Sequence, residues 1–299
     1  MSFSRRKFFK TGLLSTIPLL PFAGVNARPK EASRKLPKIS LNTFSFDQLL
    51  MSGQTDLMEL IDYCVENNFD AIDPTGYYFP GYPEAPSDEY IKTFKQKAFR
   101  NGIEISGSGI RNDFTLPDKK LRSADIDLIR RWCVVCQKMG CPLLRVFTGK
   151  YSEPRTPKSQ VNTWLIDDFK TCAEIGEEHG ILMALQNHND YVKTADEVIE
   201  ILEAVSSEWF GLHLDIGSFD HPDPYSEIAK VVKYALTFQI KEHVWTNGER
   251  VQTDYEKLMP IILKSGYKGY LPLEILKDDP YKKLPIMKKQ VEQAIANFS

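Results

Sequence analysis

The sequence predicts a single α/β domain, a (β/α)8 TIM barrel, because eight short apolar runs alternate with helical segments. The runs start roughly 30 residues apart, which is the length of one strand–helix unit. They span residues 39–46, 69–76, 103–109, 143–149, 181–188, 210–217, 238–245 and 270–276. No change in composition divides residues 39–299. A doubly wound open sheet is the alternative, but no glycine-rich phosphate loop follows the first run.

Helix signals fill the gaps between the apolar runs. Residues 55–68 begin with two capping candidates, Thr55 and Asp56, and their apolar residues recur at three- and four-residue spacing. Residues 194–205 begin with Thr194 and have Glu197 three positions later, which is the spacing of a capping box. These signals predict a helix after each strand, as a barrel requires.

The first 38 residues differ from the rest of the chain. A basic start with Arg5-Arg6 precedes an apolar stretch that ends in small residues at Ala27, so residues 1–27 are predicted to be a twin-arginine signal peptide. Residues 28–38 are predicted to be a linker. The stretch is short and is broken by Pro18 and Pro21, so no stable membrane span is expected after signal removal. The predicted location is the bacterial periplasm, and an uncleaved membrane anchor is the less favoured alternative.

Charge and cysteine content narrow the possible partners. The formal net charge is −2, whereas nucleic-acid binding requires a basic surface, so nucleic acid is not an expected partner. Cys133 and Cys136 form the one CxxC pair, and no second pair exists to complete a zinc site. The five cysteines are therefore predicted to be small buried hydrophobic residues. The sequence leaves the oligomeric state open.

Polar residues end most of the predicted strands, where a TIM barrel places its chemistry. Because side chains alternate along a strand, Gln186, Asp215, Gln239 and Glu274 are expected to point inward at a similar height. Two carboxylates and two amide oxygens suit a hard cation such as Mg²⁺ or Mn²⁺. If a histidine joined this set, Zn²⁺ would also be suitable. The other polar strand ends are Asn42, Asp73, Ser106 or Ser108, Arg145, His188, His213 and Lys241.

Three segments carry a family resemblance. "GLHLDIGSFD" (211–220) is similar to a Leu-Asp-x-Gly strand end, "QIKE" (239–242) to a His-x-Lys-Asp element, and "YLPLEIL" (270–276) to a strand that ends in Glu. These elements belong to the sugar isomerase/epimerase superfamily of xylose isomerase-like barrels, which the chain resembles over nearly its whole length after residue 38. The resemblance implies a divalent metal ion (Mn²⁺, Mg²⁺ or Zn²⁺) held by Gln186, Asp215, Gln239 and Glu274. The sequence departs from the family at three places: Gln186 replaces the usual Glu, Gln239 the usual His, and Ser218 a further common His.

The resemblance also implies a chemistry, which is metal-assisted enolisation of a keto sugar or sugar derivative. Glu274 is the expected base, and the candidates for a second proton-transfer group are His188, Lys241 and Glu242. We therefore expect a sugar isomerase/epimerase-like enzyme. A lyase or hydratase acting on an oxidised sugar is the alternative. A sugar-binding barrel without catalysis is a third reading, which the two glutamines favour.

The expected substrate is a small free or glycosidic sugar, because sugar phosphates are scarce outside the cytoplasm. Aromatic side chains in residues 77–90 are suited either to stacking on a pyranose or to packing the loop on the barrel rim. Arg145 and Lys241 are suited either to binding the sugar or to neutralising Asp215 and Glu274. The predicted substrate contacts are Asn42, Arg145, Tyr78, His213 and Trp245.

Overall fold

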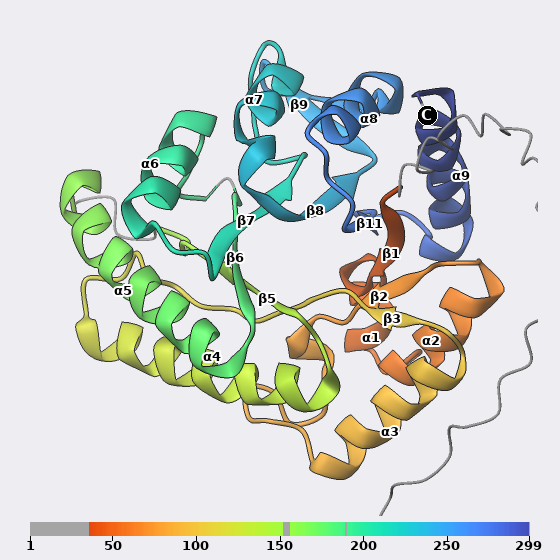
Figure 1. Ribbon diagram of the computed structural model, residues 1–299, viewed down its shortest axis with the longest axis horizontal. Helices are drawn as coiled ribbons and strands as arrows, with labels where there is room; N and C mark the ends of the chain where they lie inside the picture. Colours follow the sequence, from red (N-terminus) through yellow and green to blue (C-terminus); the bar gives the residue numbers. More distant parts are fainter. Residues whose placement is uncertain (1–35, 152–155, 189, 299) are drawn as a thin grey trace, which may run out of the picture. The chain divides into compact units, whose positions relative to one another are not determined.

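The computed structural model describes residues 36–151, 156–188 and 190–298. The predicted signal peptide and most of the predicted linker lie outside the described residues. From Leu36 onward the chain forms one compact unit. In this unit a curled parallel sheet is ringed by helices, as a TIM barrel requires (Figure 1).

The sheet closes on itself through its third strand. Its strand order is β3-β2-β1-β11-β8-β7-β6-β5-β4, and all of its pairings are parallel. The two edge strands, β3 and β4, are consecutive pieces of one extended segment, so the two edges of the sheet meet there. The strands are β1 (Lys38–Asn42), β2 (Ala71–Asp73), β3 (Glu104–Ile105), β4 (Ser108–Gly109), β5 (Leu143–Phe147), β6 (Leu182–Gln186), β7 (Phe210–Asp215), β8 (Ala235–Lys241) and β11 (Tyr270–Glu274).

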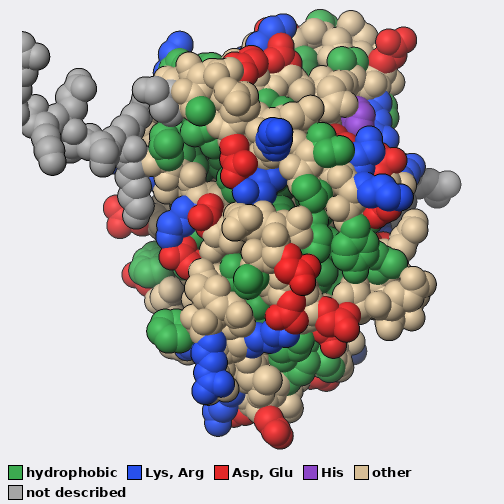
Figure 2. Space-filling view, turned by 90° about the vertical axis from the view of Figure 1, so that its right-hand side faces the viewer, with side chains coloured by type: hydrophobic (Ala, Val, Ile, Leu, Met, Phe, Trp, Pro, Cys, Tyr) green, Lys and Arg blue, Asp and Glu red, His purple; other side chains and the backbone are tan. Residues whose placement is uncertain are grey.

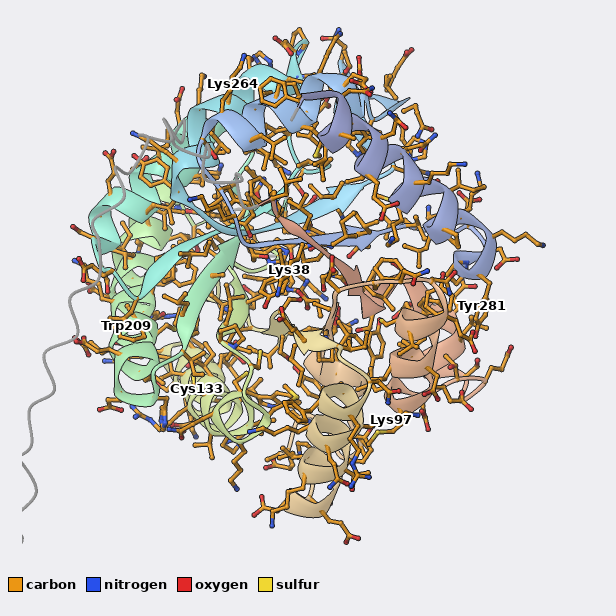
Figure 3. All side chains as sticks on the ribbon, turned by 45° about the vertical axis from the view of Figure 1, so that its right-hand side comes forward. Lys38, Lys97, Cys133, Trp209, Lys264 and Tyr281 are labelled. Atoms are coloured by element: carbon orange, nitrogen blue, oxygen red, sulfur yellow. The ribbon has the colours of Figure 1, made fainter. Side chains whose placement is uncertain are left out.

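A helix follows each of the eight barrel strands and covers the outside of the sheet. In Figure 3, Lys38 at the start of β1 lies near the centre of the ring, whereas Lys97, Lys264 and Tyr281 lie on outer helices. The α-helices are α1 (Asp47–Met51), α2 (Leu57–Glu66), α3 (Asp88–Arg100), α4 (Lys119–Met139), α5 (Lys158–His179), α6 (Ala195–Val205), α7 (Pro224–Val231), α8 (Tyr255–Lys264) and α9 (Pro280–Phe298). Short 3-10 helices occupy Thr43–Phe46, Gly76–Tyr78 and Val232–Tyr234.

Alternation along the strands separates an apolar layer from a polar interior. Leu212 and Leu214 of β7 and Phe238 and Ile240 of β8 are fully buried and belong to the apolar core shared with the helices. The residues between them are polar and contact one another across the barrel, as the next subsection describes. The hydrophobic layer therefore holds the sheet to its helices, and polar side chains fill the barrel at the ends of the strands.

Two of the predicted strands differ in the structure. The third run is interrupted after Ile105, so its two pieces pair with different neighbours. The seventh run ends at Lys241, and His243 begins β9 (His243–Thr246), which pairs antiparallel with β10 (Glu249–Gln252). His243 therefore does not continue the inward row of β8. Periodicity did not reveal this break, because the apolar pattern runs on through the hairpin.

The described residues agree with several smaller predictions. Asp56 caps α2 by accepting a hydrogen bond from the Glu59 amide, and the five cysteines are buried and unpaired. In the part of the chain that is described, no helix has both the length and the apolar character needed to cross a bilayer. On the face shown in Figure 2, acidic and basic side chains are interspersed.

Replacing the cap of α6 is expected to destabilise the fold measurably. The Thr194 hydroxyl oxygen accepts a hydrogen bond from the Glu197 amide, and the Glu197 carboxylate accepts one from the Thr194 amide. Thr194→Ala should lower the free energy of unfolding by about 1 kcal/mol, measured by urea denaturation. Thr163→Ala, which removes a hydroxyl from the interior of α5, is the control. An equal loss in both variants would show that the cap has no special role.

Candidate active site at the carboxyl ends of the strands

A cavity of about 410 Å³ opens at the carboxyl ends of the barrel strands. This volume is in the range of sites for small ligands. The cavity holds both polar groups and apolar surfaces, so it suits a molecule with hydroxyls and apolar faces. Its lining consists of Phe44, Tyr77, Arg111, Asn112, Arg145, Phe147, Gly149, Lys150, Gln186, His188, Asp190, Gln239, Lys241, Glu274 and Leu276.

The floor of the cavity is built around the ammonium group of Lys241. Its Nζ lies 2.7 Å from Glu274 Oε1 and 3.2 Å from Asp215 Oδ2. The two carboxylates are almost fully buried, and the lysine side chain is 14% exposed. The ends of β7, β8 and β11, which are neighbours in the sheet, therefore bring one cation and two anions into direct contact.

Burial and charge act in opposite directions on this cluster. Burial raises the pKa of Asp215, but the neighbouring Lys241 and His188 side chains and the hydrogen bond from Gln186 outweigh burial and hold that pKa below its usual range. Burial likewise lowers the pKa of Lys241, whereas Asp215 and Glu274 raise it, and the net result is a raised pKa. At neutral pH this raised pKa favours the ammonium form of Lys241.

Gln239 has its orientation fixed by its neighbours. Its Oε1 lies 2.8 Å from His213 Nε2 and accepts a hydrogen bond from an Arg145 guanidinium nitrogen at 3.3 Å. Its Nε2 donates to Glu274 Oε2. Turning the amide over would set its NH₂ against the arginine, which has no acceptor, and its oxygen against a carboxylate. Gln239 therefore directs its NH₂ group at Glu274, and its amide oxygen, the atom that could ligate a metal, faces His213 and Arg145.

Gln186 likewise directs its NH₂ group at a carboxylate, that of Asp215. Its Nε2 donates to Asp215 Oδ2 at 2.7 Å. Its Oε1 is buried and has no hydrogen-bond partner among the described residues. Of the two glutamines, only Gln186 thus has an amide oxygen without a hydrogen bond among the described residues.

The family resemblance implies a divalent metal here, and these residues do not fit one as they are arranged. Both glutamines point N–H groups at the carboxylates, and the Lys241 ammonium lies between Asp215 and Glu274. A doubly charged ion about 4 Å from this ammonium would be repelled by about 8 kcal/mol at an effective dielectric constant of about 20. In the described part of the chain, no group of three or more His, Cys, Asp or Glu side chains is placed to hold a metal.

Two glycines leave the space that this arrangement needs. A Cβ on Gly217 would lie 2.8 Å from Lys241 Cδ and 3.0 Å from the His243 carbonyl oxygen. A Cβ on Gly109 would lie 2.5 Å from an Arg145 guanidinium nitrogen. Both side chains reach the cavity because these positions lack a side chain.

The walls of the cavity combine aromatic rings with charged groups. The Arg111 guanidinium lies 4.1 Å from the centre of the Tyr77 ring. Just beyond the end of β6, His188 Nδ1 lies 2.9 Å from Asp190 Oδ2, and the imidazole packs edge-on against the Phe147 ring. His188 is thus next to a carboxylate and borders the cavity, which is the setting of a proton-transfer group.

The structure brings some of the predicted substrate contacts to the cavity. Arg145 lines it, whereas Trp245 lies on β9 and borders a neighbouring cavity of about 300 Å³. Asn42 is buried and accepts a hydrogen bond from the Phe44 amide as a helix cap. The Tyr78 hydroxyl donates to Asp47, and the adjacent Tyr77 lines the cavity instead. His213 is fully buried beneath Gln239, so it orients that side chain without facing the cavity.

Sequence reasoning missed Arg111, Asn112 and Lys150. Arg111 and Asn112 follow the interrupted third strand, where no periodic signal marks the strand end. Asn112 is tied to the Phe147 backbone by two hydrogen bonds, of 2.7 and 2.8 Å. A polar residue directly after a predicted strand was the one available signal for this pair.

A second buried carboxylate, Asp73, lies near the cluster without lining the cavity. Burial raises the pKa of Asp73 to about 6, although the charge of Arg145 lowers it. Its Oδ1 has no hydrogen-bond partner among the described residues. The charges of Arg145 and Glu274 therefore act on the pKa of Asp73, although Asp73 does not line the cavity.

Acid should destabilise the protein through His213. Burial, and then the charge of Arg145, lower the pKa of His213 to about 3, whereas an unfolded chain has a histidine pKa near 6.5. Below about pH 6.5 the unfolded state binds a proton that the folded state does not. The contribution of His213 to the free energy of unfolding should then fall by about 1.4 kcal/mol per pH unit between pH 6 and 4. Asp73, whose pKa is raised to about 6, contributes in the opposite direction over the same range, so the effect of His213 is read as the difference in slope between the wild type and a variant without this histidine. Urea denaturation across this range measures the slope.

His213→Gln, which keeps an N–H donor but does not titrate, should flatten this dependence. His179→Gln, at the end of α5, is the control and should leave it unchanged. Equal slopes in the wild type and His213→Gln would contradict the assignment.

Sequence comparison identifies one family. The family described as xylose isomerase-like TIM barrel matches residues 61–297. No curated protein matches the chain significantly.

Structure comparison finds the same fold in sugar epimerases and in other barrel proteins. D-psicose 3-epimerase from Clostridium cellulolyticum H10, solved with D-tagatose, has a TM-score of 0.68 and 16% identity, covering 86% of this chain and 95% of that one. The apo form of 3-keto-D-glucoside 4-epimerase from E. coli has a TM-score of 0.68 and 13% identity, covering 86% and 99%. A Mycobacterium smegmatis protein in complex with magnesium has a TM-score of 0.68 and 17% identity, covering 87% and 97%. At these identities the structural likeness shows the fold. Together with the match over residues 61–297, it means that the chain belongs to the xylose isomerase-like TIM barrel family.

Proposed function

We propose that this protein is a sugar isomerase or epimerase that acts on a keto sugar, or on a keto derivative of a sugar, by enolisation. The observation that carries the proposal is a carboxylate, Glu274, that borders a sugar-sized cavity in contact with a fixed cation. A basic oxygen next to a positive charge is what removal of a proton beside a carbonyl requires.

In the proposed step a Glu274 oxygen removes the proton from the carbon next to the substrate carbonyl. The electron pair of that C–H bond forms a C=C bond, and the carbonyl π pair moves to oxygen, which becomes an enolate. Return of a proton to the opposite face of the same carbon re-forms the carbonyl and gives an epimer. Its return to the former carbonyl carbon gives an isomer if the hydroxyl proton on the adjacent carbon passes to the enolate oxygen, so that the adjacent oxygen becomes the new carbonyl. His188 borders the same cavity and is the proposed second proton-transfer group.

The cavity favours such an intermediate electrostatically. Its lining includes four cationic side chains, of Arg111, Arg145, Lys150 and Lys241, against two acidic ones, of Asp190 and Glu274. This excess of positive charge stabilises a developing oxyanion in a partly desolvated site. It also provides donors for sugar hydroxyls.

The names of the structural neighbours support the substrate class. Two of them are a D-psicose 3-epimerase and a 3-keto-D-glucoside 4-epimerase, whose substrates carry a ketone within the sugar. We propose a substrate of the same kind for this chain. A lyase or hydratase would share the first proton transfer and then lose or add a group at the β carbon.

A panel of sugars in D₂O tests the proposal. Ketohexoses and 3-keto-glucosides are incubated with the full chain, and proton NMR follows loss of the signal beside the carbonyl. Deuterium uptake with formation of an epimer or isomer is the expected result. Uptake with release of a leaving group would indicate the lyase. Line broadening by binding, with no uptake in any sugar, would replace the enzyme with a sugar-binding barrel.

We also propose export of the mature protein, from the sequence of residues 1–27 alone. Cell fractionation followed by N-terminal sequencing tests it. A mature chain that begins after Ala27 in the periplasm is expected, and an intact N-terminus in the cytoplasm would contradict it.

A further inference from the structure

We infer that the ammonium group of Lys241 takes the place of a divalent cation in this site, so that the chain polarises its substrate without a bound metal. The catalytic role of the ammonium rests on the proposed function, whereas its position between the two carboxylates does not.

The first support is the position of the ammonium group. It lies between the carboxylates of Asp215 and Glu274, at 3.2 and 2.7 Å. These are the two hard oxygen ligands that the sequence retains from the family's set. An ion that used both carboxylates would have to displace the lysine.

The second support is the orientation of the two glutamine side chains. They occupy positions for which the family resemblance implies metal ligands, yet each directs its N–H group at a carboxylate. His213 and Arg145 contact the amide oxygen of Gln239 and so keep its N–H group turned toward Glu274. The two substitutions therefore convert ligands into hydrogen-bond donors that satisfy the carboxylates which a metal would otherwise neutralise.

The third support is the charge of the cluster. Asp215 and Glu274 contribute two negative charges, and Lys241 and Arg145 contribute two positive ones. The chain's own cations therefore offset the charges of Asp215 and Glu274, and the buried Asp73 nearby has its pKa raised to about 6. The space for the lysine stem is also provided by the chain, since a side chain at Gly217 would collide with Lys241 Cδ.

This placement gives Lys241 a direct role toward substrate. An ammonium has three donors, and among the described residues two carboxylates account for two of them. Lys241 borders both the main cavity and the neighbouring one. Its remaining N–H can therefore bind the substrate carbonyl oxygen. It would then stabilise the negative charge on that oxygen when Glu274 removes the neighbouring proton.

Mn²⁺ binding to the full chain, without any sugar, tests the inference. Chelated and dialysed wild type is titrated with Mn²⁺ and followed by electron paramagnetic resonance of the free ion. We expect no stoichiometric binding by the wild type. Lys241→Met should bind Mn²⁺ at least tenfold more tightly, because it leaves the two carboxylates without their cation. Lys241→Gln, which removes the charge but keeps a donor, replaces this variant if Lys241→Met does not fold.

Lys230→Met is the matched control. Lys230 also contacts two carboxylates, of Glu227 at 2.7 Å and Asp196 at 3.8 Å, but it lies outside the cavity on a more exposed face. It should leave Mn²⁺ binding as in the wild type.

Two outcomes would overturn the inference. One equivalent of Mn²⁺ bound by the wild type and lost in Asp215→Asn would show a metal site that coexists with Lys241. Binding by neither the wild type nor a folded Lys241 variant would show that the lysine does not hold a cation's place. Because these titrations contain no sugar, a lack of deuterium uptake would end the proposed function without changing their result.

Discussion

Glu274→Gln is expected to lower the rate of deuterium uptake into the substrate by about 10²- to 10⁴-fold, the usual contribution of a positioned general base. The amide keeps the size of the side chain and an acceptor for Lys241, but it cannot remove a proton. Uptake is measured by proton NMR in D₂O, and circular dichroism and thermal unfolding show whether the variant is folded.

Glu227→Gln is the control for this substitution. Glu227 is also a buried carboxylate that pairs with a lysine, at 2.7 Å, but it lies outside the cavity. Its variant should exchange at the wild-type rate. A Glu274→Gln protein that exchanges within about threefold of the wild type would rule out Glu274 as the base and leave His188 as the first candidate.

Lys241→Met should have the largest effect on stability, lowering the free energy of unfolding by about 3–5 kcal/mol. The substitution leaves Asp215 and Glu274 buried beside each other without their shared cation. Urea denaturation at pH 7 in the presence of a chelator measures the loss. Adding Asp215→Asn to this variant removes one of the two charges and should recover part of it.

Lys230→Met again provides the comparison, because the Lys230 side chain is 46% exposed, whereas that of Lys241 is 14% exposed. It should cost less stability than Lys241→Met. Equal losses in the two lysine variants would mean that the contacts of Lys241 are no stronger than a surface ion pair, and that its position between the carboxylates has little weight.

The fold was predictable because two patterns are clear in this chain, the regular spacing of the apolar runs and the helical repeat of apolar residues between them. Apolar runs about 30 residues apart, with capping signals such as Thr194 and Glu197 between them, indicate alternating strands and helices. The break in the third strand and the hairpin that begins at His243 were not predictable. Both depend on which neighbour a backbone segment pairs with, and a single sequence does not contain that information.

The polar cluster at the floor of the cavity was predictable from the sequence, whereas the contacts within it were not. Strand alternation correctly groups Gln186, Asp215, Gln239, Lys241 and Glu274. A residue type does not say which end of an amide faces a carboxylate, however. That depends on His213 and Arg145, which come from two other strands. For the same reason Tyr77, rather than its neighbour Tyr78, lines the cavity.

The most direct test of the central claim is deuterium uptake into the sugar panel by chelated, metal-free wild-type protein, before and after addition of Mn²⁺. Enolisation by Glu274 with the Lys241 cation predicts uptake into at least one keto sugar at a rate that Mn²⁺ does not change. Uptake that appears only after Mn²⁺ is added, or no uptake under either condition, would contradict it.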